Sequence, residues 1–184
     1  MLLHTLRAFG ALLLHVSRAH AILPIALWSG LIYVLSSLSA RGLGTIGRVT
    51  FLSNLGHAPL FGLLGLWFAL ALPREAAGRS SGWPRLDRAG RGTVFLAVAI
   101  WSIADELHQG HAGRGRDFSL LDVVTGLVGA VAVLAVIDYA GRDGASERGL
   151  WARLGLGGLA SALAAALATW LPPVLGGLGG AAWL

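Results

Sequence analysis

Ionisable side chains gather in one stretch of this otherwise apolar chain. Residues 105–109 read Asp-Glu-Leu-His-Gln and close one apolar run, and Asp122 opens the next. Each such carboxylate costs about 2.5 to 3.5 kcal/mol at the centre of a membrane helix, so neighbouring groups must compensate it. Carboxylates near a histidine can act as general acid and base, and an arginine can hold a phosphate through its planar fork. The sequence therefore predicts a polar site here.

The candidate site residues divide by chemistry. Asp105 and Glu106 are the acid/base candidates, with His57 as their proton partner. The candidates for substrate binding are Gln109, His108, Arg114, Arg116 and Asp122. On a helix, positions 105, 108 and 109 share one face, because side chains three and four residues apart are neighbours. A structural alternative stays open, in which Arg116 pairs with a carboxylate and only fixes the loop.

The composition identifies an integral membrane protein. Of the 184 residues 55% are hydrophobic and 12% are charged, and the mean hydropathy is +0.71. No basic stripe with interleaved aromatic residues is present, which argues against a nucleic-acid partner. The absence of cysteine excludes thiolate and iron–sulfur chemistry. No metal is expected, because no HExxH or comparable ligand spacing occurs. The cofactor is unknown, although a histidine in an apolar setting could ligate haem or a pigment.

Apolar runs of membrane-spanning length predict an all-α, polytopic transmembrane helical bundle. The expected spans are 21–38, 55–72, 92–109, 120–139 and 154–171. Residues 1–20 resemble a signal peptide, but His15 and Arg18 interrupt the approach to the potential cleavage site, so we expect an uncleaved interfacial helix. The predicted organisation is an amphipathic segment (1–20), a four-span core (21–140) and a fifth span with a Gly-rich tail (141–184).

Arginine placement predicts the orientation, because cytoplasmic loops of membrane proteins are rich in positive residues. Ten arginines fall on one side of the expected bundle and four on the other, the latter being Arg41, Arg48, Arg114 and Arg116. We therefore expect a bacterial inner-membrane protein with its N-terminus inside. The start of span two, the end of span three and the start of span four then meet at the outer leaflet and face outward.

The ordered combination of these residues resembles the VanZ-like family of small bacterial membrane proteins. That family has a histidine near the start of its second span, D-E-x-x-Q at the end of its third, then an arginine, and R-x-x-x-x-x-D leading into a fourth span with glycine. The similar residues here are His57, residues 105–109, Arg116, Asp122 and Gly129, and the resemblance covers residues 21–139.

Two departures from the family pattern concern the loop and the fourth span. The loop 110–115 is one residue longer and lacks the common proline, so either Arg114 or Arg116 corresponds to the family arginine. Gly126 replaces an asparagine. The resemblance implies a connection to the cell envelope, and in some members to glycopeptide resistance, but no known reaction.

Two functions follow from the sequence. In the leading hypothesis, the outward site binds or modifies an anionic lipid or a lipid-linked envelope precursor through its phosphate headgroup. In the alternative, the chain is a non-catalytic accessory or scaffold subunit that docks onto a membrane protein partner through residues from Leu154 to Leu184.

Overall fold

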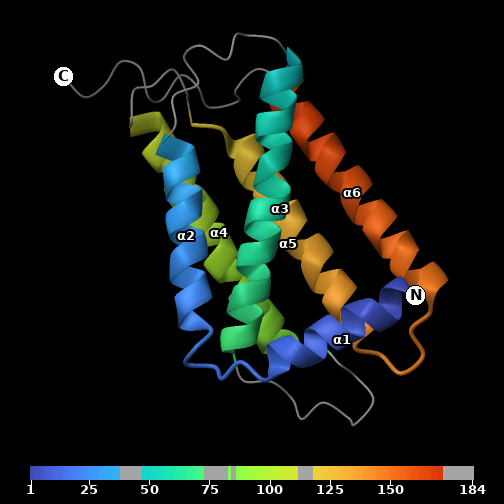
Figure 1. Ribbon diagram of the computed structural model, residues 1–184. Helices are drawn as coiled ribbons and strands as arrows, with labels where there is room; N and C mark the ends of the chain where they lie inside the picture. Colours follow the sequence, from blue (N-terminus) through green and yellow to red (C-terminus); the bar gives the residue numbers. More distant parts are fainter. Residues whose placement is uncertain (38–46, 73–82, 84–85, 112–117, 172–184) are drawn as a thin grey trace.

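The computed structural model describes residues 1–37, 47–72, 83, 86–111 and 118–171, without the side chains of 47–49. The described part of the chain is all-helical and contains no strand (Figure 1). Its six helices are α1 (Leu2–Leu14), α2 (Ile22–Ser37), α3 (Gly47–Ala71), α4 (Arg88–His111), α5 (Leu120–Ala140) and α6 (Glu147–Trp170). A helix lies at each expected span and at the N-terminal segment, which confirms the predicted all-α class.

Three helices are long and apolar enough to cross a membrane, among the described residues. These are Thr50–Ala71 within α3, Leu120–Ala140 and Glu147–Trp170. At about 1.5 Å per residue each exceeds the roughly 30 Å of a hydrocarbon core. The three helices indicate a membrane protein. The passage of α2 and α4 through the bilayer stays a prediction, since α2 has only 16 residues and α4 carries the polar segment.

The central contact of the bundle is a close approach of α3 and α5. A Cβ added at Gly129 would lie 2.0 Å from the carbonyl oxygen of Ala58, and one added at Gly62 would lie 2.9 Å from Val133. Small residues let helix backbones pack this closely, and close packing stabilises helix association in membranes. The contact also positions His57, the residue before Ala58, against α5.

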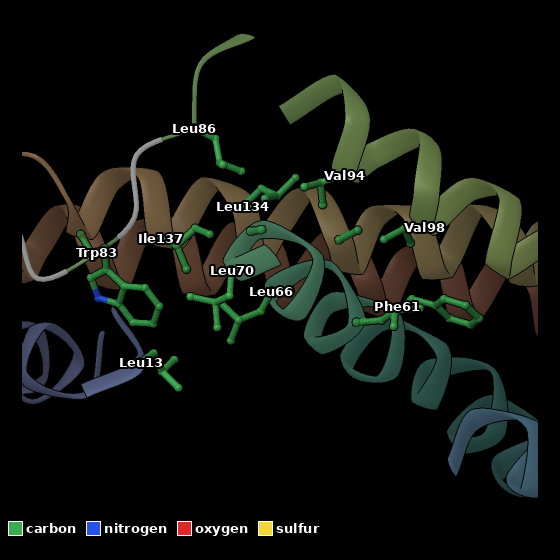
Figure 2. Close-up of a cluster of buried hydrophobic side chains, with 14 of the residues drawn as sticks. Leu13, Phe61, Leu66, Leu70, Trp83, Leu86, Val94, Val98, Leu134 and Ile137 are labelled. Atoms are coloured by element: carbon green, nitrogen blue, oxygen red, sulfur yellow. The ribbon is translucent and has the colours of Figure 1, made fainter. Parts of the chain in front are cut away.

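A cluster of buried apolar side chains forms the core of the bundle (Figure 2). It is built from side chains of α3, α4 and α5 that are almost fully buried, including Phe61, Leu70, Val94, Val98 and Ile137. The Phe61 ring stacks on the ring of His57 with centroids 6.1 Å apart. Phe61 therefore marks where the apolar core ends and the polar site begins.

Helix α1 lies across the end of the bundle where α5 ends and α6 begins, and it runs crosswise to the long helices (Figure 1). Arg7 donates hydrogen bonds to the carbonyl oxygens of Ala140 (2.9 Å) and Arg142 (2.6 Å), at the end of α5. The first residue of α6, Glu147, accepts a hydrogen bond from the backbone N–H of Leu3 at 2.9 Å. These contacts attach α1 to α5 and α6. Its location at a membrane surface stays a prediction.

Candidate functional site

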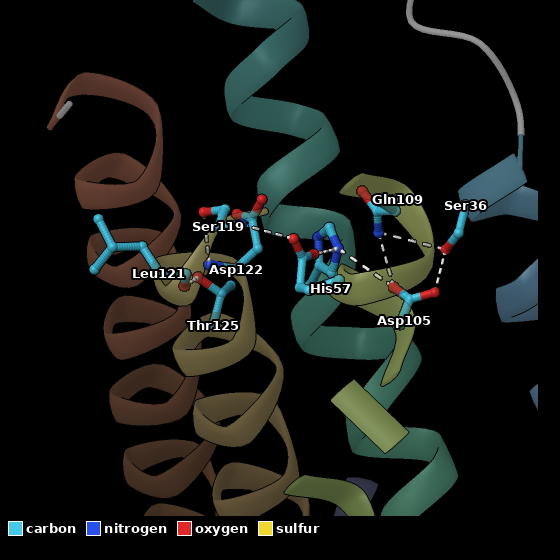
Figure 3. A network of polar contacts seen from close by, with 9 residues as sticks. Ser36, His57, Asp105, Gln109, Ser119, Leu121, Asp122 and Thr125 are labelled. Carbon is cyan, nitrogen blue, oxygen red and sulfur yellow. Dashed lines mark hydrogen bonds and ion pairs between the residues drawn. The ribbon is translucent and has the colours of Figure 1, made fainter. Parts of the chain in front are cut away.

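His57, Asp105 and Glu106 meet inside the bundle, with the histidine on α3 and both carboxylates on α4 (Figure 3). The Nε2 atom of His57 lies 3.3 Å from Oε1 of Glu106 and 3.9 Å from Oδ2 of Asp105. All three side chains are buried, and Glu106 is only 1% exposed. This group is called the polar cluster below.

Two consecutive residues of a helix point about 100° apart, so both carboxylates can be buried only if α4 has neighbours on two sides. Helix α2 covers Asp105, whose Oδ1 accepts a hydrogen bond from the hydroxyl of Ser36. The start of α5 covers Glu106, whose Oε2 accepts a hydrogen bond from the backbone N–H of Ser119 at 3.0 Å. The polar cluster therefore depends on three helices packed around the end of α4.

The Asp105 carboxylate is held from two directions. Besides the Ser36 contact, its Oδ2 accepts a hydrogen bond from Nε2 of Gln109 at 2.8 Å, across one helical turn. The same Gln109 nitrogen lies 3.5 Å from the Ser36 hydroxyl. The sequence-based placement of Asp105 and Gln109 on one face is confirmed, and it fixes the Asp105 side chain next to His57.

The Glu106 carboxylate is fixed by the start of α5. Ser119 is the N-cap of this helix, and its hydroxyl accepts a hydrogen bond from the backbone N–H of Asp122 at 3.2 Å. The positive end of the α5 dipole and the Ser119 N–H both favour a carboxylate at this point. The other oxygen of Glu106, Oε1, has no hydrogen-bond partner among the described residues and faces His57.

Two further polar atoms on the helices of the polar cluster are buried and accept or donate no hydrogen bond within the described part of the chain. They are Nδ1 of His57 and the hydroxyl oxygen of Ser102, which lies one turn before Glu106 on α4. Buried polar groups are usually paired, and each unpaired one costs about 1 to 3 kcal/mol. Unpaired polar atoms in and next to the polar cluster are typical of a site that takes up another molecule or ion.

Most of the predicted site residues come together. His57, Asp105, Glu106 and Gln109 are in direct contact, and Asp122 is buried beside them and interacts electrostatically with His57. His108 lies outside this group. Its Nε2 atom is 3.0 Å from the Ser37 hydroxyl, and its ring contacts that of Tyr33 at a centroid distance of 4.5 Å. Arg114 and Arg116 lie outside the described residues.

Sequence reasoning did not assign roles in the site to Ser36 and Ser119. Ser119 had a recognisable signal, since Ser-x-x-Asp before an apolar run is a capping box, whose serine begins the helix. For Ser36 the signal is the family resemblance, since Ser36-Ser37 match small hydroxyl residues at the end of span one, but only the packing of α2 against α4 brings its hydroxyl to Asp105. Both serines orient a carboxylate.

The polar cluster offers two kinds of chemistry. A histidine flanked by two carboxylates can accept, hold and return a proton. The same three side chains each provide one metal-ligand atom, and these atoms lie within 4.8 Å of one another. The expectation of no metal was based on spacing along the sequence, which does not report donors on separate helices.

Comparison of the chain with known protein families, curated proteins and solved structures finds no match. The resemblance to the VanZ-like family therefore rests on the residues named above. The chemistry of the site must be argued from its geometry.

Proposed function

We propose that this chain is a VanZ-like, multi-pass protein of the bacterial inner membrane, with its N-terminus inside. Its polar cluster binds the phosphate headgroup of an anionic lipid or a lipid-linked envelope precursor. The observation that carries the proposal is the burial of His57, Asp105 and Glu106 together within a bundle of apolar helices. Ionisable groups at such positions are costly, and in membrane proteins they generally mark binding sites or proton paths.

The location of the polar cluster toward one end of the bundle supports a lipid headgroup as the ligand. The start of α3, the end of α4 and the start of α5 lie at one end of the bundle, opposite α1 (Figure 1). The arginine-rich connections predict that this end faces outward. A site close to the membrane surface can receive a headgroup while its acyl or polyprenyl chain stays between lipids.

The residues take distinct roles in this proposal. His57 and Glu106, 3.3 Å apart, exchange a proton with the bound headgroup. Asp105 holds the imidazole from its other side, and Gln109 holds Asp105. Two bare carboxylates repel a phosphate, so binding also needs positive charge, which Arg114 or Arg116 supplies. Asp122 orients that arginine.

Glu106→Gln tests the proposal because it keeps the volume of the side chain and removes its charge. We expect the purified variant to bind a polyprenyl phosphate at least about tenfold more weakly than the wild type, because His57 loses the charged partner that orients it toward the headgroup. The measurement is native mass spectrometry of detergent-solubilised protein against polyprenyl phosphate, phosphatidylglycerol and phosphatidylcholine. In cells, the variant should lose any glycopeptide-resistance phenotype at normal membrane levels.

Asp138→Asn is the matched control, because Asp138 pairs with Arg91 and Arg142 away from the polar cluster. Its lipid binding should equal that of the wild type. Equal lipid binding by Glu106→Gln and the wild type would contradict the proposal. So would wild-type protein that binds phosphatidylcholine as well as it binds polyprenyl phosphate and phosphatidylglycerol.

A second candidate, the scaffold subunit, is favoured by the exposure of α6. Only 22% of its membrane-length window is buried, against 56% for α3. Leucines at 156, 159, 163 and 167 leave an apolar surface on this helix. Lipid acyl chains can cover this apolar surface as well as a partner protein can. Copurification distinguishes the two. Fixed stoichiometry with another membrane protein in mild detergent, lost on deletion of residues 154–184, would establish the scaffold function.

A further inference from the structure

When both of its carboxyl groups are ionised, the polar cluster carries more negative than positive charge. It contains two carboxylates and one imidazole, and the carboxylate of Asp122 lies nearby. Within the described part of the chain, the ion-pair contacts of Asp105 and Glu106 are to His57 alone. Even a protonated His57 balances only one of the two carboxylates. An unbalanced charge that is buried away from water costs several kcal/mol.

We propose that His57 Nε2, Asp105 Oδ2 and Glu106 Oε1 bind one divalent transition-metal ion, of the zinc or manganese type. Such an ion balances both carboxylates while the imidazole stays neutral, as a metal ligand must. One nitrogen and two carboxylate oxygens suit these ions, whereas magnesium favours oxygen ligands throughout. The role of the ion in lipid binding rests on the proposed function. The binding of the ion by these three residues does not.

The distances between the donor atoms fit such an ion. Ligand atoms at about 2.1 Å from a tetrahedral zinc ion lie roughly 3.4 Å from each other. Nε2 of His57 lies 3.3 Å from the Glu106 oxygen and 3.9 Å from the Asp105 oxygen. The first distance needs no change. The second needs a contraction of about half an ångström, which side-chain rotation provides.

The surroundings of the carboxylates resemble the outer shell of a metal site, where hydrogen bonds orient the ligands. Ser119 holds one oxygen of Glu106, and this leaves Oε1, which has no hydrogen-bond partner among the described residues, directed at His57. Asp105 differs from Glu106, because both of its oxygens accept a hydrogen bond, Oδ1 from Ser36 and Oδ2 from Gln109. Oδ2 would therefore bind the ion with its second lone pair while Gln109 keeps it oriented. Oε1 of Glu106 is buried and accepts no hydrogen bond among the described residues, and its ion-pair contact there is His57 alone. This open acceptor is the observation that indicates a ligand beyond the cluster itself.

The ion adds a second positive charge to the one that Arg114 or Arg116 supplies for phosphate binding in the proposed function. Three protein ligands leave a fourth position open in a tetrahedral site, as in zinc sites that bind substrate. A phosphate oxygen of the lipid headgroup fills that position. Two carboxylates that would repel the headgroup then bind it through the metal.

The test is titration of the purified, chelator-treated full chain in detergent with zinc chloride and with manganese chloride. We expect isothermal titration calorimetry and elemental analysis to show one bound ion per chain. Glu106→Gln and Asp105→Asn should each weaken binding at least a hundredfold, and Gln109→Ala about 10- to 100-fold, as for outer-shell residues. Asp138→Asn should bind like the wild type.

Folding is checked separately by thermal unfolding, in which the metal should raise the Tm of the wild type and not that of Glu106→Gln. Wild-type protein that takes up neither ion, or variants that bind as well as the wild type, would overturn the metal site. Polyprenyl phosphate binding that survives chelator in the wild type and fails in Glu106→Gln would refute the role of the ion in phosphate binding but keep the proposed function. Metal binding without lipid binding would refute the proposed function alone.

Discussion

Replacing Gly129 with alanine should force α3 and α5 apart and disturb the polar cluster. The added Cβ would lie 2.0 Å from the carbonyl oxygen of Ala58 and 2.5 Å from its carbonyl carbon. The first contact is about 1 Å short of the 3.0 Å below which such contacts are essentially never found. Both atoms belong to backbone, so no side chain can move aside, and the helices must separate by about 1 Å. Overpacking of this kind costs about 1 to 3 kcal/mol.

The assay is unfolding of the purified protein in mixed micelles with increasing denaturing detergent, followed by far-UV circular dichroism. Gly158→Ala on α6 is the matched control, because a Cβ at Gly158 meets nothing within 4 Å. Alanine favours a helix over glycine by up to about 1 kcal/mol, so this control should be neutral or slightly stabilised. Gly129→Ala should unfold at lower detergent and bind the polyprenyl phosphate more weakly, since His57 adjoins Ala58.

Equal unfolding midpoints for Gly129→Ala and Gly158→Ala would refute the reasoning. That result would mean that α3 and α5 do not approach as closely as the structure has them. A destabilised Gly129→Ala that keeps full lipid binding would instead separate helix packing from the positioning of His57, and would contradict only the link between the two.

Two other predictions concern the opposite end of the bundle and its orientation. Arg7→Ala should lower the free energy of unfolding by about 1 to 3 kcal/mol, because it removes two hydrogen bonds from a charged donor to the end of α5. Arg91→Ala, which breaks one partly exposed ion pair, should cost less than about 1 kcal/mol in the same denaturation assay. Since the chain has no cysteine, His111→Cys should react with a membrane-impermeant maleimide in intact cells. Gly144→Cys should react only after lysis, and the reverse pattern would invert the proposed topology.

Much of the fold is predictable from the sequence because the membrane imposes simple rules. Backbone polar groups within a bilayer must be satisfied internally, so long apolar runs predict helices with little ambiguity. The boundaries of α5 agree closely with the expected span, since Ser119 and Gly141 flank a long apolar run whose charged residues, Asp122 and Asp138, lie near its two ends. The span ending at 109 extends to His111 in α4, because helical hydrogen bonding does not stop where hydropathy falls.

The polar cluster was predictable only in part. Spacing along α4 places Asp105 and Gln109 on one face, because that relation is local to a helix. Spacing does not predict the contacts of His108, which shares the face but lies against Ser37 and Tyr33 on α2. Its role in substrate binding stays a prediction. The difference arises because a helix face is broad, and neighbouring helices decide which part of it each side chain contacts.

By itself, the sequence determined that this is an all-helical membrane protein and which short segment holds its polar chemistry. Composition and periodicity report local free energies, and those suffice for helices in an apolar solvent. Only the tertiary structure decided that Nε2 of His57 lies 3.3 Å from Glu106, and that Ser36 and Ser119 hold the two carboxylates. Those contacts join helices distant in sequence, and they depend on how closely glycine lets α3 approach α5, a property of packing that no spacing along the chain records.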